Sequence, residues 1–180
     1  QHALALMPLR RVIWSIVGAG GQTEADELDR VVALAGRFPN IRGVQMDDFF
    51  RASPNETGRV AVHTASELEA LKRRLMVDGR KLELWVTLYT HNLSLPGVEE
   101  HLKECDVVTY WTWYARELRN LEENFGRLES IVPSSRKVLG CYMWDYGDQR
   151  QMPMALMRHQ CRLALGWLRE GRIEGIVFLA

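Results

Sequence analysis

Apolar positions along the chain follow two spacings that alternate from one end to the other. Short apolar or alternating runs predict strands, over residues 11–17, 41–48, 82–90, 106–113, 137–145 and 173–179. Apolar residues three and four positions apart predict helices between them, over residues 24–37, 65–79, 97–104, 115–131 and 154–171. This alternation predicts βαβ units and a parallel sheet, in which right-handed crossovers bring all strand C-termini to one edge.

Two of the predicted helices begin with capping signals. Thr64-Ala65-Ser66-Glu67 has the spacing of a capping box, in which the Thr64 hydroxyl serves a backbone amide and Glu67 reaches back to the cap. Thr23 directly precedes Glu24, so we expect its hydroxyl to cap the first helix. No linker, repeat or low-complexity segment interrupts the pattern, and we interpret residues 1–180 as a single domain.

The polarity of the predicted strands distinguishes a doubly wound open sheet from a (β/α)8 barrel. Strands of a doubly wound sheet lie beneath helices on both faces and read as continuous apolar runs. Here one face of the third strand carries Leu84, Val86 and Leu88, and the other carries polar and aromatic residues: Glu83, Trp85, Thr87, Tyr89 and His91. One apolar face and one mixed face favour the barrel, with the open sheet as the alternative.

The length of the chain determines how much of a barrel it forms. A (β/α)8 barrel usually needs about 250 residues, whereas this chain has 180. The last apolar run, 173–180, has no helix after it. We therefore expect a parallel α/β barrel of the TIM type with about six of its eight strands present, truncated at one or both ends.

Acidic, histidine and aromatic residues gather at the C-terminal ends of four predicted strands, within residues 43–50, 85–91, 107–114 and 141–146. Ligands bind at this edge of parallel α/β proteins because the strand-to-helix loops meet there. We interpret these strand ends as the rim of an active site.

Two acidic positions at the rim are candidates for catalysis. Asp47 shares the alternation phase of Gly43 and Gln45, so it is predicted to point into the barrel mouth, while Asp48 begins the loop. The neighbouring Asp48 and Phe49 predict a raised pKa for Asp47, which suits a general acid. Asp145 is the second candidate acid. The alternative for each is ordinary turn chemistry at a strand end.

The other rim residues are candidates for substrate binding. His91 lies in the inward phase beside Tyr89 and is predicted to hydrogen-bond substrate. Flat aromatic rings with a polar edge suit the C–H faces of sugars, and such rings follow the strands: Trp111, Trp113, Tyr142 and Trp144. The alternative for the aromatic residues is that they fill the core.

Composition and missing motifs exclude several classes of function. The formal net charge of zero argues against a nucleic-acid partner, and the apolar runs are too short to span a membrane. The three cysteines form no CxxC pair, and HExxH and GxSxG motifs are absent. The glycine loop 18–21 lacks the third glycine of a dinucleotide fingerprint, so we interpret it as a tight turn or a point of close substrate approach. We expect no cofactor and no metal.

Three runs resemble strand ends of TIM-barrel glycoside hydrolases or hydrolase-like relatives: Gly-Val-Gln-Met-Asp-Asp-Phe-Phe (43–50), Trp-Thr-Trp-Tyr (111–114) and Tyr-Met-Trp-Asp-Tyr (142–146). The resemblance implies cleavage of a glycosidic bond in a small sugar or oligosaccharide. Asp47 would be the acid, Asp145 the base or nucleophile, and Asp48 and His91 would orient them. The chain departs from these enzymes in carrying Asp where they usually carry Glu.

Two other functions fit the same residues. One is a metal-assisted hydrolase or lyase that uses Asp47, His91 and Asp145 as ligands. The other is a sugar-binding barrel without catalysis, which keeps the aromatic wall.

Overall fold

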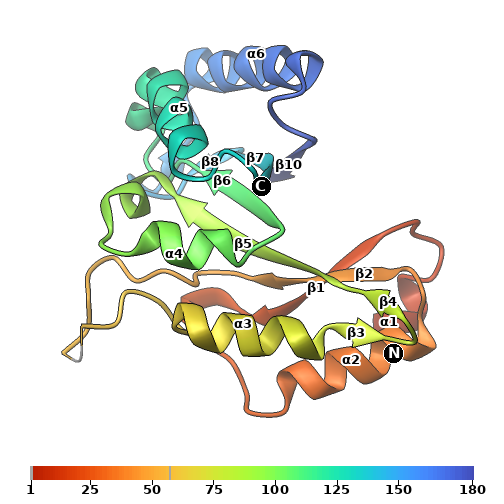
Figure 1. The fold of residues 1–180 in the computed structure, drawn as a ribbon. Coiled ribbons are helices and arrows are strands. Elements are labelled where there is room, and N and C mark those ends of the chain that lie inside the picture. The colour runs from red at the N-terminus through yellow and green to blue at the C-terminus, as the bar shows by residue number, and fades with distance from the viewer. Residues whose placement is uncertain (1, 57) are drawn as a thin grey trace.

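The computed structural model describes residues 2–56 and 58–180, and a curved sheet of six parallel strands lies at its centre (Figure 1). In spatial order the strands are β1 (Val12–Val17), β2 (Ile41–Met46), β5 (Glu83–Tyr89), β6 (Val107–Trp111), β7 (Arg136–Tyr142) and β10 (Gly175–Leu179). The spatial order equals the chain order, so the winding never reverses as it does in a doubly wound sheet. The sheet curls into a half-barrel with helices on its outer face. The predicted partial TIM-type barrel is confirmed, and the alternative of an open sheet does not apply.

Helices and short hairpins connect the strands. The described α-helices are α1 (His2–Ala5), α2 (Glu27–Arg37), α3 (Ala65–Arg74), α4 (Val98–Lys103), α5 (Leu121–Ile131) and α6 (Met154–Glu170). Short 3₁₀ helices are η1 (Ala19–Gly21), η2 (Thr90–Ser94) and η3 (Ala115–Asn120). Two hairpins pair β3 (Met76–Val77) with β4 (Arg80–Lys81), and β8 (Trp144–Asp145) with β9 (Arg150–Gln151). None of the described helices combines the length and apolarity needed to cross a membrane.

The core lies between the outer face of the sheet and the helices. Leu84, Val86 and Leu88 of β5 are fully buried there, so the predicted apolar face of this strand is confirmed. Leu28 and Val31 of α2 pack into the same cluster. Side chains of the opposite phase therefore face the concave side of the half-barrel, where the site is built.

The two predicted caps have different outcomes. The capping box is confirmed, because the Glu67 amide donates to Thr64 Oγ1 at 3.2 Å and the Thr64 amide donates to Glu67 Oε2 at 2.7 Å. The predicted cap at Thr23 is wrong. The helix begins three residues later than predicted, at Glu27, and the Thr23 hydroxyl donates instead to the carbonyl oxygen of Ile16 at 2.8 Å.

Three element ends differ from the prediction. The helix predicted over 65–79 ends at Arg74, because Asp78 and Gly79 adopt positive φ and form the turn of the β3–β4 hairpin. The helix predicted over 115–131 is divided into η3 and α5. The strand predicted over 137–145 leaves the sheet after Tyr142, and its last two residues belong to the β8–β9 hairpin.

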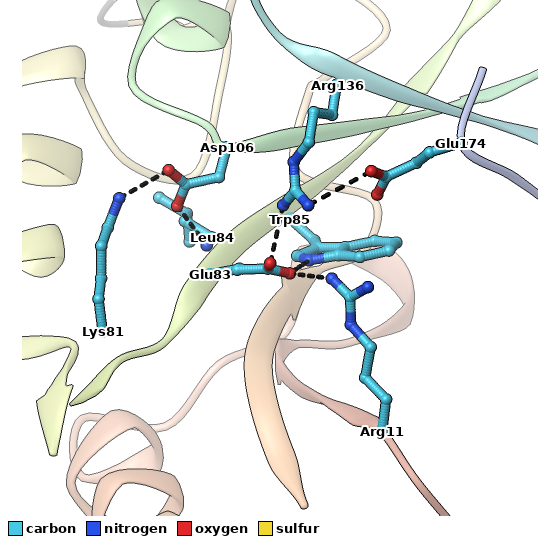
Figure 2. A network of polar contacts seen from close by, with 8 residues as sticks. All are labelled: Arg11, Lys81, Glu83, Leu84, Trp85, Asp106, Arg136 and Glu174. Carbon is cyan, nitrogen blue, oxygen red and sulfur yellow. Dashed lines mark hydrogen bonds and ion pairs between the residues drawn. The ribbon is translucent and has the colours of Figure 1, made fainter. Parts of the chain in front are cut away.

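A charged network crosses the N-terminal end of the half-barrel (Figure 2). The Glu83 carboxylate lies between the guanidinium groups of Arg11 and Arg136, with Arg136 Nη2 2.9 Å away, and it accepts a 2.9 Å hydrogen bond from Trp85 Nε1. Arg136 also pairs with Glu174 at 3.3 Å. Burial acts to raise the pKa of Glu83, but these hydrogen bonds outweigh it and lower that pKa. The network joins segments at the beginnings of β1, β5, β7 and β10.

Candidate functional site

The end of β2 directs two consecutive carboxylates into two different cavities. Gln45 and Asp47 line a cavity of about 370 Å³ on the concave face of the sheet, whereas Asp48 lines a cavity of about 430 Å³ at the rim. Gly43 shares the inward phase, and a Cβ there would lie only 2.7 Å from the carbonyl oxygen of Glu83. The predicted inward phase of Asp47 is confirmed, and Asp48 lies beyond the strand end, as predicted.

Asp48 is held by hydrogen bonds from the end of β5 and from the glycine loop 18–21. Its backbone is left-handed, with φ of 43°, and this breaks the alternation of β2. Its Oδ1 accepts a 2.7 Å hydrogen bond from the Tyr89 hydroxyl, and its Oδ2 accepts one of 2.8 Å from the Gly20 amide. A Cβ on Gly21 would lie 3.2 Å from the Asp48 carbonyl oxygen. The glycine loop therefore closely approaches Asp48 and fixes the orientation of its carboxylate.

The pKa of Asp47 is raised above its ordinary value of 3.8. Burial is the largest cause, and the negative charge of Asp48 adds to it. Hydrogen bonds from the Thr87 hydroxyl and the Asp48 amide oppose this shift without cancelling it. The direction agrees with the sequence-based prediction. A carboxyl group of this kind stays protonated to a higher pH, which is the property required of a general acid.

Hydrogen bonds across three strands direct a proton toward Asp47. Trp111 Nε1 donates to Thr109 Oγ1 at 3.1 Å, and the Thr109 hydroxyl lies within hydrogen-bond distance of two acceptors, the Val86 carbonyl oxygen at 3.2 Å and Thr87 Oγ1 at 3.3 Å. Gln45 Nε2 also donates to Thr87 Oγ1, at 2.8 Å. Because Thr87 accepts a hydrogen bond from Gln45, its own hydroxyl proton is available to Asp47.

Aromatic rings form a wall along both cavities. The ring centroids of Tyr89 and Trp113 are 5.6 Å apart, those of Trp113 and Tyr142 are 6.0 Å apart, and those of Trp111 and Tyr142 are 4.7 Å apart. Tyr146 joins them at 4.6 Å from Tyr142. Trp113 and Tyr146 are half-buried, whereas the other three rings are buried. The structure thus brings together Tyr89, Trp111, Trp113 and Tyr142 among the predicted binding residues.

A glycine in β7 makes room for this wall. A Cβ on Gly140 would lie 1.9 Å from the indole of Trp111, so the ring occupies the space that any side chain would need. Glycine inside a strand often marks such a close approach. A glycine within a predicted strand was visible in the sequence, but the sequence did not show which aromatic ring packs against it.

His91 lies beside the wall and lines the rim cavity. Its ring stacks on Tyr89 with a centroid separation of 5.3 Å and an interplanar angle of 10°. Burial lowers the pKa of His91, and the charge of Asp48 opposes that change. At neutral pH the imidazole is therefore mainly uncharged and can donate or accept a hydrogen bond in the rim cavity.

Asp145 lies outside both cavities, so the structure does not bring it together with Asp47. Its side chain is fully buried and accepts hydrogen bonds from the Ala115 amide at 3.0 Å, the Asp148 amide at 3.3 Å and Arg150 Nε at 3.1 Å. Burial acts to raise the pKa of Asp145, but these bonds outweigh it and the pKa is lowered. This geometry is that of a structural anchor for the β8–β9 hairpin.

Trp144 also lies outside both cavities. It is 38% exposed on β8, because the chain has already left the sheet at this point. The predicted metal ligands Asp47, His91 and Asp145 are likewise not gathered together. Among the described residues, no group of three or more His, Cys, Asp or Glu side chains is placed to hold a metal ion.

Sequence reasoning gave no site role to four residues that the structure places in or beside the cavities. Thr87 hydrogen-bonds Asp47, Thr109 contacts Thr87, Tyr146 extends the wall, and Arg51 lines the rim cavity. For Thr87 and Thr109, the alternation of side chains along their strands could have indicated that they face the concave side of the sheet. Arg51 and Tyr146 lie in loops, whose conformation no periodicity predicts.

One of the comparisons with known proteins supports the fold. No protein-family model and no curated protein matches the chain. Wild-type sialic acid aldolase from Ruminococcus gnavus is structurally similar, with a TM-score of 0.53 and 11% identity over 95% of this chain and 54% of that one. The PgaB (BpsB) glycoside hydrolase domain from Bordetella bronchiseptica gives a TM-score of 0.45 and 12% identity over 94% of this chain and 64% of that one. The chain thus spans about half of the aldolase, and this likeness supports the TIM-type fold alone.

Proposed function

We propose that the rim of the half-barrel binds a carbohydrate and that Asp47 and Asp48 cleave its glycosidic bond. One observation carries the proposal. Two consecutive carboxylates, held in different orientations at the end of β2, lie beside a wall of aromatic rings at the edge where parallel α/β proteins bind ligands.

The two carboxylates have different environments and therefore suit different roles. Asp47, with its raised pKa, would donate its proton to the glycosidic oxygen as the bond to the leaving sugar breaks. Asp48 would face the positive charge that develops on the remaining sugar ring and accept a proton from the water that attacks it. Tyr89 and Gly20 keep the Asp48 carboxylate in one orientation, so little reorganisation is needed when charge develops.

The aromatic wall would bind the sugar rings. Trp113 and Tyr146 keep part of their surface accessible, and Trp113 and His91 both line the rim cavity. Apolar ring faces suit the C–H faces of a sugar, while the imidazole of His91 would hydrogen-bond a hydroxyl group.

Two matched substitutions test the assignment. Asp47→Asn and Asp48→Asn each remove a charge with little change in shape, and Asn tolerates the positive φ of residue 48. In an assay that detects new reducing ends from a panel of oligosaccharides, each change is expected to lower kcat by about 100-fold or more. Asp78→Asn is the control, because Asp78 also has positive φ but lies at an exposed turn of another hairpin. Unchanged cleavage by both site variants would exclude the proposed acid and base.

One observation favours a second candidate function, sugar binding without cleavage. Glycosidases usually place their two carboxyl groups on either side of the scissile bond, and Asp145, expected in that position, is buried elsewhere. Oligosaccharide binding by the wild-type protein with no release of reducing ends would select this function.

A further inference from the structure

The rim cavity is lined by an arginine whose charge no described residue neutralises. Arg51 lies in the loop after β2, and its guanidinium forms no ion pair with the part of the chain that the structure describes. Three other arginines line cavities, and each of them pairs with a carboxylate: Arg74 with Asp29, Arg136 with Glu83 and Glu174, and Arg172 with Glu129. Arg51 differs from them because it lines its cavity without a carboxylate partner among the described residues.

The main chain of Arg51 is anchored, although its side chain is exposed. Its amide donates to the carbonyl oxygen of Val60 at 2.8 Å, and its carbonyl oxygen accepts a 3.4 Å hydrogen bond from Asn92 Nδ2. Asn92 is fully buried and also accepts a hydrogen bond from the Tyr89 amide at 3.0 Å. The backbone of Arg51 is thus tied to the segment that carries Tyr89 and His91.

The acidic residue that lines the same cavity, Asp48, already accepts other hydrogen bonds. Both oxygens of Asp48 accept hydrogen bonds, one from Tyr89 and one from Gly20, and Asp48 forms no ion pair with Arg51. His91 is mainly uncharged at neutral pH, as argued above. Among the residues that line the rim cavity, Arg51 therefore provides the positive charge, and Trp113 provides an aromatic ring in the same cavity.

We propose that the rim cavity is specific for a sugar that carries a negatively charged substituent, a carboxylate or a sulfate, and that Arg51 binds this group. The inference rests on the proposed function in that the same cavity holds the sugar. A guanidinium presents a planar pair of donors that matches two oxygens of either group. A neutral sugar would offer this guanidinium no anionic partner.

Binding of matched sugar pairs by isothermal titration calorimetry tests the inference. The first pair is tetragalacturonate and its methyl ester, and the second is neocarratetraose sulfate and its desulfated form, so the pairs separate carboxylate from sulfate. In at least one pair the charged member is expected to bind the wild-type protein about 10-fold more tightly or better. This preference should weaken as the NaCl concentration rises.

Substitutions at Arg51 show whether the preference comes from this residue. Arg51→Gln is expected to abolish the preference, and Arg51→Lys to keep part of it, because an ammonium group retains the charge but not the planar donors. Arg42→Gln is the control, since Arg42 is exposed near the opposite end of β2 and the same charge is lost. Thermal unfolding confirms that each variant is folded.

The outcomes separate this inference from the proposed function. Equal affinity within both pairs, no binding of either charged probe, or a preference that survives in Arg51→Gln would overturn the role of Arg51. Cleavage of sugars without any preference for charge would leave the proposed hydrolysis standing and the inference wrong. Charge-selective binding without cleavage would support Arg51 and contradict the hydrolytic function.

Discussion

The hydroxyl of Tyr89 donates a 2.7 Å hydrogen bond to Oδ1 of Asp48, and this contact joins the ends of β5 and β2 at the rim. Burial and this hydrogen bond both raise the pKa of Tyr89, so its proton stays on the phenol throughout the physiological range. Tyr142 lies next to it, and burial raises the pKa of Tyr142 to about 12. The rim thus contains neutral phenols and a carboxylate in a fixed orientation.

Tyr89→Phe is expected to lower stability by about 1–2 kcal/mol, because a hydrogen bond to a charged group is lost while the ring remains. It should also lower kcat, since the Asp48 carboxylate is no longer held in one orientation. Urea denaturation and the reducing-end assay measure the two effects. Tyr114→Phe is the matched control, because the hydroxyl of Tyr114 has no hydrogen-bond partner in the described chain and its ring contacts Arg116 and Gly147. Equal losses in both variants would show that the Asp48 contact has no special role.

Asp47→Asn is expected to stabilise the protein at pH 7 relative to wild type. The pKa of Asp47 is raised in the folded state, so between its ordinary value of 3.8 and the raised value the folded chain binds more protons than the unfolded chain. Stability is therefore lost as pH rises through this range, and the asparagine variant avoids that loss. Urea denaturation from pH 3 to pH 8 measures the difference between the two proteins. A difference that does not change with pH would show that the pKa of Asp47 is the same in both states.

Gly140→Ala is expected to destabilise the protein by about 1–3 kcal/mol, because the added methyl group requires the Trp111 ring to move. The tryptophan fluorescence spectrum should change with it. Gly126→Ala is the control, since Gly126 lies in α5 with nothing within 4 Å of the added carbon. That change should instead stabilise the protein by about 0.5–1 kcal/mol. The same result for both variants would contradict the packing described for Trp111.

Asp145→Asn is expected to lower stability by about 1–3 kcal/mol, since the buried side chain loses the charge that Arg150 and two amides bind. Because the pKa of Asp145 is lowered and that of Asp47 is raised, the two residues change folding stability in opposite directions as the pH rises. The stability that the Asp145 carboxylate contributes is present above pH 3.8 and is lost as the pH falls toward the lowered pKa of the folded state.

The control for Asp145 is Asp148→Asn. Asp148 also pairs with Arg150, at 3.0 Å, but it is exposed, so a smaller effect is expected. Thermal unfolding from pH 3 to pH 7 compares the two variants. A large loss of kcat in Asp145→Asn at a temperature where the variant is fully folded would argue against a purely structural role.

Much of the fold was predictable because strand phase is a local property. The alternation in β2 and β5 gave the inward position of Asp47 and the buried face of Leu84, Val86 and Leu88 before any pairing was known. The threonine and glutamate of the first turn of α3 formed a local cap in the same way.

The remaining features depend on contacts between distant segments. The Met143 amide still donates to the carbonyl oxygen of Leu179 at the end of β10, but residues 144–145 pair with 150–151 instead of extending β7. That pairing buries Asp145 and exposes Trp144, and no pattern within 137–145 encodes it. Thr23 likewise has the sequence of a cap, but it reaches back to Ile16 once the glycine loop has formed.

The network around Glu83 (Figure 2) lies at the N-terminal ends of the strands, whereas the rim lies at their C-terminal ends. Ion pairs therefore link strands that are not neighbours in the sheet at one end, while sugar chemistry is proposed for the other. Loops above the strands could then be exchanged to alter selectivity, in the laboratory or during evolution, without disturbing these ion pairs. An engineered library confined to the rim should consequently yield mostly folded proteins.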